Sequence, residues 1–298
     1  MRVTEQTRAR HFGATDLLMF TMALIWAINF SVVKYATQVF DPMVFVTLRV
    51  FASGVLLALV MLLKERPRLS RGTWIRLLLL GVAGHGLYQL CFVGGLARTR
   101  AGNAALIVAA APAFIAITSG LRGLERVRKV TFAGIALSIA GVGLVVIGSS
   151  PAAAGGKSTM LGTILVFGGV LCWTVFTIGL QPFTRAVSAT QIAGITILGG
   201  VVPLLLVTMP NLVRTNWGAV GAGGWLALFY SSVISMVVGY YLWYHGLKVL
   251  GATRTAVYTN LQPIIALGVA WIFLSEIPTA WQMIGAATIV SGIFLTRA

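Results

Sequence analysis

The sequence predicts an all-α, polytopic membrane protein with ten transmembrane helices, arranged as two inverted five-helix repeats. Composition, the length of the apolar runs and an internal repeat predict this class. Of the 298 residues, 58% are hydrophobic and 9% are charged, whereas a soluble domain carries about 25% charged residues. The runs lack the alternation of polar and apolar residues that is typical of a membrane β-barrel. We therefore expect helices that cross a lipid bilayer.

Ten apolar runs have about the length that spans the hydrocarbon core of a bilayer. They lie at residues 16–36, 43–63, 77–96, 103–121, 130–148, 161–182, 191–209, 225–247, 255–274 and 280–296. Residues 149–160, rich in Ala, Gly and Ser, are predicted to be a flexible linker between the halves. The expected organisation is a cytoplasmic tail (1–15), a first repeat (16–148), the linker (149–160) and a second repeat (161–298).

The two halves match one another at an offset of about 151 residues. This offset places Pro112 on Pro263 and Glu125 on Glu276. We expect both glutamates to cap helix ends or to form ion pairs there. Because each half has five helices, the second copy must enter the membrane from the opposite face. Inverted repeats are typical of transporters that alternate access to a site between the halves; the alternative is a duplicated scaffold that moves nothing.

The basic residues predict how the chain is oriented in the membrane. They cluster at the N-terminus and in segments 64–76 and 122–129, which lie on one side when the helices alternate in direction. Such clusters are typical of cytoplasmic loops. We therefore expect a multi-pass protein of the cell inner membrane with both termini in the cytoplasm. The net charge of +16 is explained by this topology, and no nucleic-acid partner is expected.

The start and end of the repeat resemble a known family. Residues 26–30 (WAINF) followed by Lys34, and residues 274–276 (LSE) followed by Gly285 and Gly292, are similar to EamA-type repeats of the drug/metabolite transporter superfamily. The resemblance covers nearly the whole chain, and is greatest to YddG-type exporters of aromatic amino acids. It implies ten helices, small organic substrates and export from the bacterial cytoplasm.

Candidate substrate-binding residues are the aromatic and polar side chains near the middle of the runs. The offset places Tyr240 on Gln89 and Trp243 on Phe92, so one wall carries an amide and the other is aromatic. Such walls suit a planar apolar substrate with a polar end; the alternative is an interfacial belt or packing against lipid. For Tyr258 and Gln262 the alternative is that they form hydrogen bonds between helices. The predicted set is Trp26, Asn29, His85, Tyr88, Gln89, Phe92, Trp173, Tyr240, Trp243, Tyr244, Tyr258 and Gln262.

Three residues of the predicted spans have more than one interpretation, and two prolines are candidate hinges. His85 is either a cavity residue, with a proton-relay role, or a neutral imidazole bonded to a neighbouring helix. Pro112 and Pro263 are matched mid-span prolines, and thus candidates for helix-breaking hinges. Lys34 and Arg49 lie toward the outer ends of the first two helices, where they could attract a substrate carboxylate or extend to lipid headgroups.

Several kinds of site are not expected. The six acidic residues all fall at span ends or in loops, whereas proton- or sodium-coupled carriers commonly place a carboxylate at mid-membrane. This favours facilitated diffusion, exchange or coupling through another group, and disfavours a site for cations. The three histidines lie far apart, and no Gly-rich phosphate motif survives the transmembrane assignment. No catalytic group, metal site or cofactor is therefore predicted.

The sequence thus predicts a secondary transporter that exports small amphipathic metabolites, with aromatic or other apolar amino acids as the leading substrates. The two halves would alternate around a cavity formed by the first, third, fourth, sixth, eighth and ninth helices. An exporter of drugs or nucleotide-like metabolites is the alternative, and a membrane-embedded enzyme is less favoured. The expected partners are the small-molecule substrate and the lipid bilayer, and a monomer is expected because the repeat is internal.

Overall fold

The computed structural model describes residues 13–65, 68–122, 129–148, 159–184, 186–250, 255 and 258–295. All regular secondary structure in these residues is helical. Seven helical segments within them are long and apolar enough to cross a membrane. The predicted fold class is confirmed.

The helices of the two halves follow the ten predicted runs. The first half contains α1 (Ala14–Val39), α2 (Pro42–Lys64), α3 (Arg71–Gly81), η1 (Val82–Leu87), α4 (Tyr88–Arg98), α5 (Ala101–Val108), α6 (Ala111–Leu121) and α7 (Lys129–Gly148). The second contains α8 (Met160–Leu180), η2 (Gln181–Phe183), α9 (Ala189–Arg214), η3 (Trp217–Ala219), α10 (Ala222–Phe229), η4 (Tyr230–Val238), α11 (Gly239–Val249), η5 (Thr259–Leu261), α13 (Gln262–Leu274) and α14 (Ala280–Leu295). The segments η1 and η4 are π-helical and continue their neighbours, so α3–η1–α4 and α10–η4–α11 each form one span.

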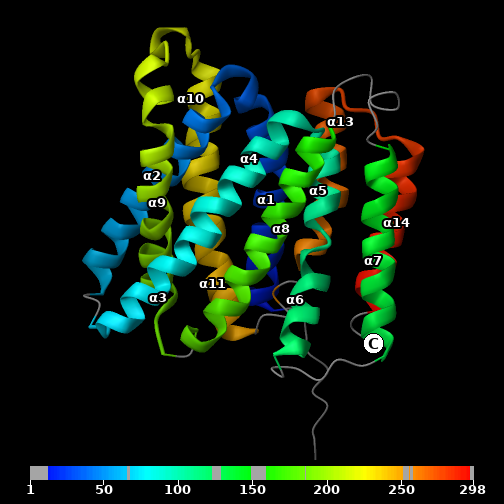
Figure 1. The fold of residues 1–298 in the computed structure, drawn as a ribbon, viewed down its shortest axis with the longest axis horizontal. Helices are drawn as coiled ribbons and strands as arrows, with labels where there is room; N and C mark the ends of the chain where they lie inside the picture. The colour runs from blue at the N-terminus through cyan, green and yellow to red at the C-terminus, as the bar shows by residue number, and fades with distance from the viewer. Residues whose placement is uncertain are drawn as a thin grey trace, which may run out of the picture.

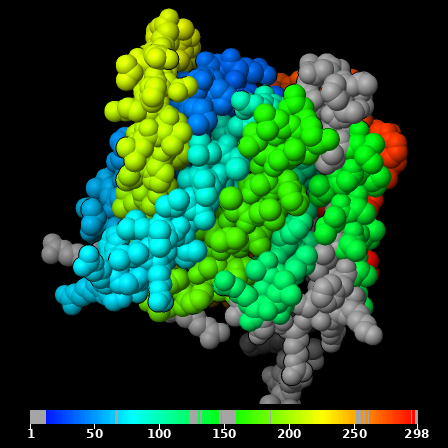
Figure 2. Space-filling model, viewed as in Figure 1, coloured from blue at the N-terminus to red at the C-terminus, as the bar shows by residue number. Residues whose placement is uncertain are grey.

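Helices of both halves interleave in the bundle. Helix α1 lies near its centre and contacts α4 and α5 of the first half as well as α11 and α13 of the second (Figure 1). The space-filling view shows α3 and α4 packed beside α9 and α8 over one face (Figure 2). We call the face at which α1 begins the lower face, as Figure 1 is drawn, and the opposite one the upper face.

The last helices of the two repeats, α7 and α14, pack together at one edge of the bundle (Figure 1). A Cβ atom at Gly141 would lie 2.9 Å from the carbonyl oxygen of Gly285, and one at Gly285 would lie 2.9 Å from the carbonyl oxygen of Gly141. In lipid, such small residues let helix backbones approach closely. The two glycines therefore allow α7 and α14 to pack closely, where a larger side chain would separate the two helices.

Polar side chains begin several of the helices at the membrane faces. The Asp41 carboxylate accepts hydrogen bonds from the backbone N–H groups of Met43 (2.8 Å) and Val44 (3.2 Å), and Pro42 follows as the first residue of α2. Ser188 accepts from the N–H of Gln191 at the start of α9. Each cap satisfies donors that a helix end leaves without a partner.

Candidate functional site

A cavity of about 60 Å³ lies in the centre of the bundle, between the two halves. It is lined by Trp26, Asn29, Phe30, Arg49, Tyr88, Gln89, Phe92, Val108, Ala111, Val170, Trp173, Ser235, Tyr240, Thr259 and Gln262. These residues come from the six helices that the sequence analysis named and also from α2, through Arg49. This volume is large enough for a few water molecules.

The structure brings most of the predicted site residues into this wall and leaves four out of it. Those that line the cavity are Trp26, Asn29, Tyr88, Gln89, Phe92, Trp173, Tyr240 and Gln262. Those that do not are His85, Trp243, Tyr244 and Tyr258. The role of each residue in binding substrate stays a prediction.

The cavity lies on the pseudo-two-fold axis that relates the repeats. Gln89 donates a hydrogen bond from Nε2 to the hydroxyl of Tyr240 at 3.2 Å, and these two residues are mates in the repeat. Trp26 and Trp173, which align between the first and sixth helices at a local offset of 147 residues, also contact each other, with ring centroids 6.1 Å apart. A residue can touch its own symmetry mate only close to the axis. A site on this axis borders both halves, which is where alternating access requires it.

Trp173 of α8 is the hub of an aromatic cluster around the cavity. Its ring centroid lies 5.3 Å from that of Tyr88, 5.4 Å from Phe176, 5.5 Å from Trp243 and 5.9 Å from Tyr240. The side chain is 9% exposed, so its ring is covered by these neighbours. Tilted and edge-to-face pairs of this kind each contribute about 0.5–1.5 kcal/mol beyond the burial of their area.

His85 lies behind the cavity wall. Its ring packs against Tyr240 and Phe176 at centroid distances of 4.9 and 5.2 Å, and its Nε2 lies 3.4 Å from the Tyr244 hydroxyl. The side chain is 1% exposed. Of the two interpretations of His85, the geometry favours the imidazole bonded to a neighbouring helix. Trp243, 1% exposed, is likewise packed inside the cluster.

Tyr258 lies below the cavity. Its hydroxyl donates to the Oδ1 atom of Asp16, in the first turn of α1 at the lower face. Thr259 and Gln262 follow it along the chain and reach the cavity. Tyr258 thus joins the first helix of one repeat to the ninth helix of the chain at the lower face.

Two π-helical segments lie at matched positions, since the repeat offset places η1 on the second part of η4. Within η4 the carbonyl of Ser235 accepts a hydrogen bond from Trp26 Nε1 (3.0 Å), and that of Ser232 accepts one from Ser53 Oγ (2.9 Å). A π-helical turn changes the hydrogen-bond pattern of the backbone, and here two of its carbonyl oxygens accept bonds from side chains of other helices. Such turns are frequent at functional sites. The apolar pattern of the sequence did not indicate these turns.

The matched prolines stand where their spans change geometry. Residues 109–110 form a turn before α6, and Pro112 lies in the first turn of that helix. Pro263 lies in the first turn of α13, directly after the 3-10 segment η5. Ala111 and Gln262, which the repeat offset aligns, stand beside the prolines and line the cavity. Each predicted break is thus present, and hinge motion at these breaks stays a prediction.

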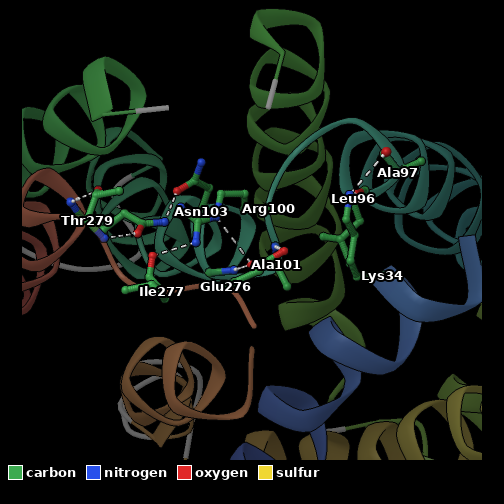
Figure 3. Close-up of polar contacts among 11 residues, drawn as sticks. Lys34, Leu96, Ala97, Arg100, Ala101, Asn103, Glu276, Ile277 and Thr279 are labelled. Atoms are coloured by element: carbon green, nitrogen blue, oxygen red, sulfur yellow. Dashed lines mark hydrogen bonds and ion pairs between the residues drawn. The ribbon is translucent and has the colours of Figure 1, made fainter. Parts of the chain in front are cut away.

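At the upper face, the charged residues near span ends are engaged with backbone groups (Figure 3). Lys34 Nζ donates to the carbonyls of Leu96 (2.9 Å) and Ala97 (3.4 Å), which joins α1 to the end of α4. Cations are favoured at such C-terminal carbonyls by the helix dipole. Lys34 therefore lies outside the lining of the cavity.

Glu276 caps a helix of the opposite repeat (Figure 3). Its carboxylate accepts from the N–H groups of Ala101 and Gly102, each at 3.3 Å, and lies 3.9 Å from Arg100 Nε. Arg100 also donates to the carbonyl of Ile277 at 2.7 Å. The expected cap and ion pair are thus confirmed for Glu276. Its mate, Glu125, lies outside the described residues.

Replacing Glu276 by alanine is expected to lower the free energy of unfolding by about 1–2 kcal/mol, because the first turn of α5 loses its cap and Arg100 loses its carboxylate. Glu276→Gln should lose less, because an amide oxygen still accepts a hydrogen bond. Thermal unfolding of the purified protein in detergent measures both. An alanine variant that melts with the wild type would show that the cap contributes nothing.

Comparisons with known proteins agree with this architecture. The chain is 29% identical over 289 residues to an uncharacterized transporter of Archaeoglobus fulgidus, covering 95% of this chain and 97% of the relative. It is 23% identical to the uncharacterized transporter YyaM of Bacillus subtilis, covering 93% and 91%. It is 24% identical over 218 residues to a protein of Streptantibioticus cattleyicolor described as "Probable terminal-alkyne amino-acid exporter", covering 73% and 71%.

A solved crystal structure has the same fold, with a TM-score of 0.68 at 21% identity over 95% of this chain and 96% of that chain. The model of the EamA-like transporter family matches residues 13–147 and again residues 160–298. The two matches fall on the two halves of the internal repeat. The chain therefore belongs to the EamA-like transporter family and is a multi-pass membrane transporter, not an enzyme.

Proposed function

We propose that this protein exports small amphipathic metabolites, foremost aromatic or other apolar amino acids, across the bacterial inner membrane. The observation that carries the proposal is the central cavity, whose wall combines aromatic rings with a few polar side chains. An aromatic amino acid has one planar apolar part and one charged part, which this wall complements. The relative described as a "Probable terminal-alkyne amino-acid exporter" supports amino acids as the substrate class.

The mechanism we propose is alternating access by a monomer with both termini in the cytoplasm. The cavity of about 60 Å³ is large enough for a few water molecules, so an aromatic amino acid enters only after the walls separate. Contacts at both faces would have to open in turn: Tyr258 with Asp16 at the lower face, and Glu276 with the start of α5 at the upper face. The breaks before Pro112 and Pro263 border the cavity and would let the spans bend there.

None of the lining residues that the structure describes carries a carboxylate. This supports facilitated diffusion or exchange over coupling through a membrane acid. It also disfavours cationic drugs as substrates, because the wall offers no opposite charge.

Counterflow in reconstituted vesicles tests the proposal. Vesicles with the purified protein, preloaded with unlabelled phenylalanine or tryptophan, should accumulate the labelled amino acid above protein-free vesicles. Facilitated diffusion or exchange predicts that accumulation continues when the proton gradient is collapsed. If neither amino acid nor its close analogues exchanges faster than in protein-free vesicles, the substrate proposal is wrong.

A further inference from the structure

Arg49 is the basic residue of the cavity wall, and it lies deep within the membrane span. It is the eighth residue of α2, which places its Cα roughly 10 Å along the helix from Pro42 at a rise of about 1.5 Å per residue. The side chain is 2% exposed and lines the cavity. It therefore does not extend to lipid headgroups, which was one of the two expectations for this residue.

Arg49 has no anionic partner within the described part of the chain. Its Nε and Nη1 atoms have no hydrogen-bond partner there, and no described carboxylate forms an ion pair with it. Its guanidinium lies 5.9 Å from the centroid of the Phe45 ring. Two cations at the upper face contrast with it, since Lys34 binds carbonyls and Arg100 faces Glu276. An unpaired buried charge destabilises a folded protein, so its presence at a cavity points to a ligand.

The polar atoms around Arg49 indicate which ligand. A guanidinium presents donors in a planar fork that matches both oxygens of a carboxylate. The same wall holds another unpartnered donor, Gln262 Nε2, and an unpartnered acceptor, Gln89 Oε1. The donors suit a carboxylate and the acceptor suits an ammonium group, while Trp26 and Trp173 offer ring faces for an apolar side chain.

We infer that Arg49 binds the carboxylate of the transported molecule, and that the site selects carboxylates with a planar apolar group over the matching amides and amines. This inference deepens the proposed function and rests on it for the identity of the substrate. Arg49 belongs to one repeat alone, because the offset that aligns Trp26 with Trp173 aligns Arg49 with Thr196. Because this charge is present in one repeat only, it fixes the carboxylate at one side of the cavity.

The test compares pairs of probes that differ only in the carboxylate. Purified protein is titrated with phenylalanine and with phenylalaninamide, and the apparent Kd is obtained from the thermal shift. We expect the wild type to prefer phenylalanine by at least about tenfold, since a hydrogen bond to a charged group contributes about 1.5–3 kcal/mol. In Arg49→Gln the preference should fall to near one while the amide still binds, and Arg49→Lys should be intermediate.

Two further measurements separate ligand binding from a structural role. Ligand-free Arg49→Met should melt a few degrees above the wild type, because an apolar side chain of similar length replaces a buried charge that has no anionic partner. Arg98→Gln, which removes an exposed arginine bonded to its own helix, should keep the preference for phenylalanine. If the Arg49 variants melt below the wild type and lose both probes equally, Arg49 is structural and the inference is overturned.

A second probe pair distinguishes failure of the inference from failure of the proposed function. In the first case, vesicles exchange no amino acid, but the wild type binds indole-3-acetate better than indole-3-acetamide and Arg49→Gln does not. The carboxylate site is then supported, and the proposal of an amino-acid substrate is wrong. If phenylalanine is exchanged and Arg49→Gln keeps the full preference over the amide, the export proposal stands and the role of Arg49 is wrong.

Discussion

Replacing Gly81 by alanine is expected to lower the melting temperature by roughly 6–12 °C, because the added methyl group would overlap a neighbouring helix. A Cβ atom at Gly81 would lie 1.8 Å from the carbonyl oxygen of Thr196 and 2.7 Å from its carbonyl carbon. These are backbone atoms of α9, so no side-chain rotation relieves the overlap and the two helices must separate. Overpacking costs about 1–3 kcal/mol when neighbours can adjust, and here they cannot.

A second glycine at the crossing of α3 and α9 tests the same contact, and two glycines elsewhere serve as controls. At Gly199 of α9, a Cβ atom would lie 2.1 Å from the carbonyl oxygen of Leu78, so Gly199→Ala should be as harmful as the change at Gly81. At Gly143 and Gly268, nothing lies within 4 Å of the added atom. Alanine there should be neutral or stabilise by up to about 1 kcal/mol, because glycine is a poor helix former. Equal melting of all four variants would contradict the close approach of α3 and α9.

The backbone of this fold could be predicted because lipid imposes a simple rule on sequence. A span must be apolar along its length, so runs such as 43–63 and 191–209 mark α2 and α9 directly. The repeat offset then gave the inversion, and with it the mates Gln89 and Tyr240. The structure adds that these mates form a hydrogen bond, which shows that both lie close to the pseudo-symmetry axis.

The orientation of single side chains was harder to predict, for physical reasons. Arg49 stands at a depth from which a long side chain can reach either the headgroups or the bundle interior, and sequence does not distinguish these. His85 shares a helical face with Tyr88 and Gln89, but it lies within the π-helical segment η1, and there spacings based on 3.6 residues per turn do not hold. A prediction based on the spacing of a regular α-helix therefore placed His85 in the cavity wall. In the structure, the π-helical turn places His85 behind Tyr240.

Replacing Trp173 by leucine is expected to reduce the exchange of phenylalanine and tryptophan at least about tenfold, whereas Trp173→Phe should retain most of it. Leucine fills part of the same space but removes the ring at the hub of the cluster, and each aromatic pair is worth about 0.5–1.5 kcal/mol. The loss of one ring pair between wall and substrate, at the upper end of this range, weakens binding roughly tenfold, since about 1.4 kcal/mol is one factor of ten. Phenylalanine keeps a ring face that a planar substrate can stack on.

The control for this change is a tryptophan outside the cavity. Trp271 lies on α13 and is 56% exposed, so Trp271→Leu should exchange substrate at the wild-type rate. Exchange is measured by counterflow and divided by the amount of folded protein that elutes as a single peak in size exclusion. Because both leucine variants lose the same atoms, a difference between them reports the position of the ring and not its hydrophobic burial in general. If Trp173→Leu exchanges substrate as the wild type does, the aromatic wall does not bind the substrate, and the site must lie elsewhere along the axis.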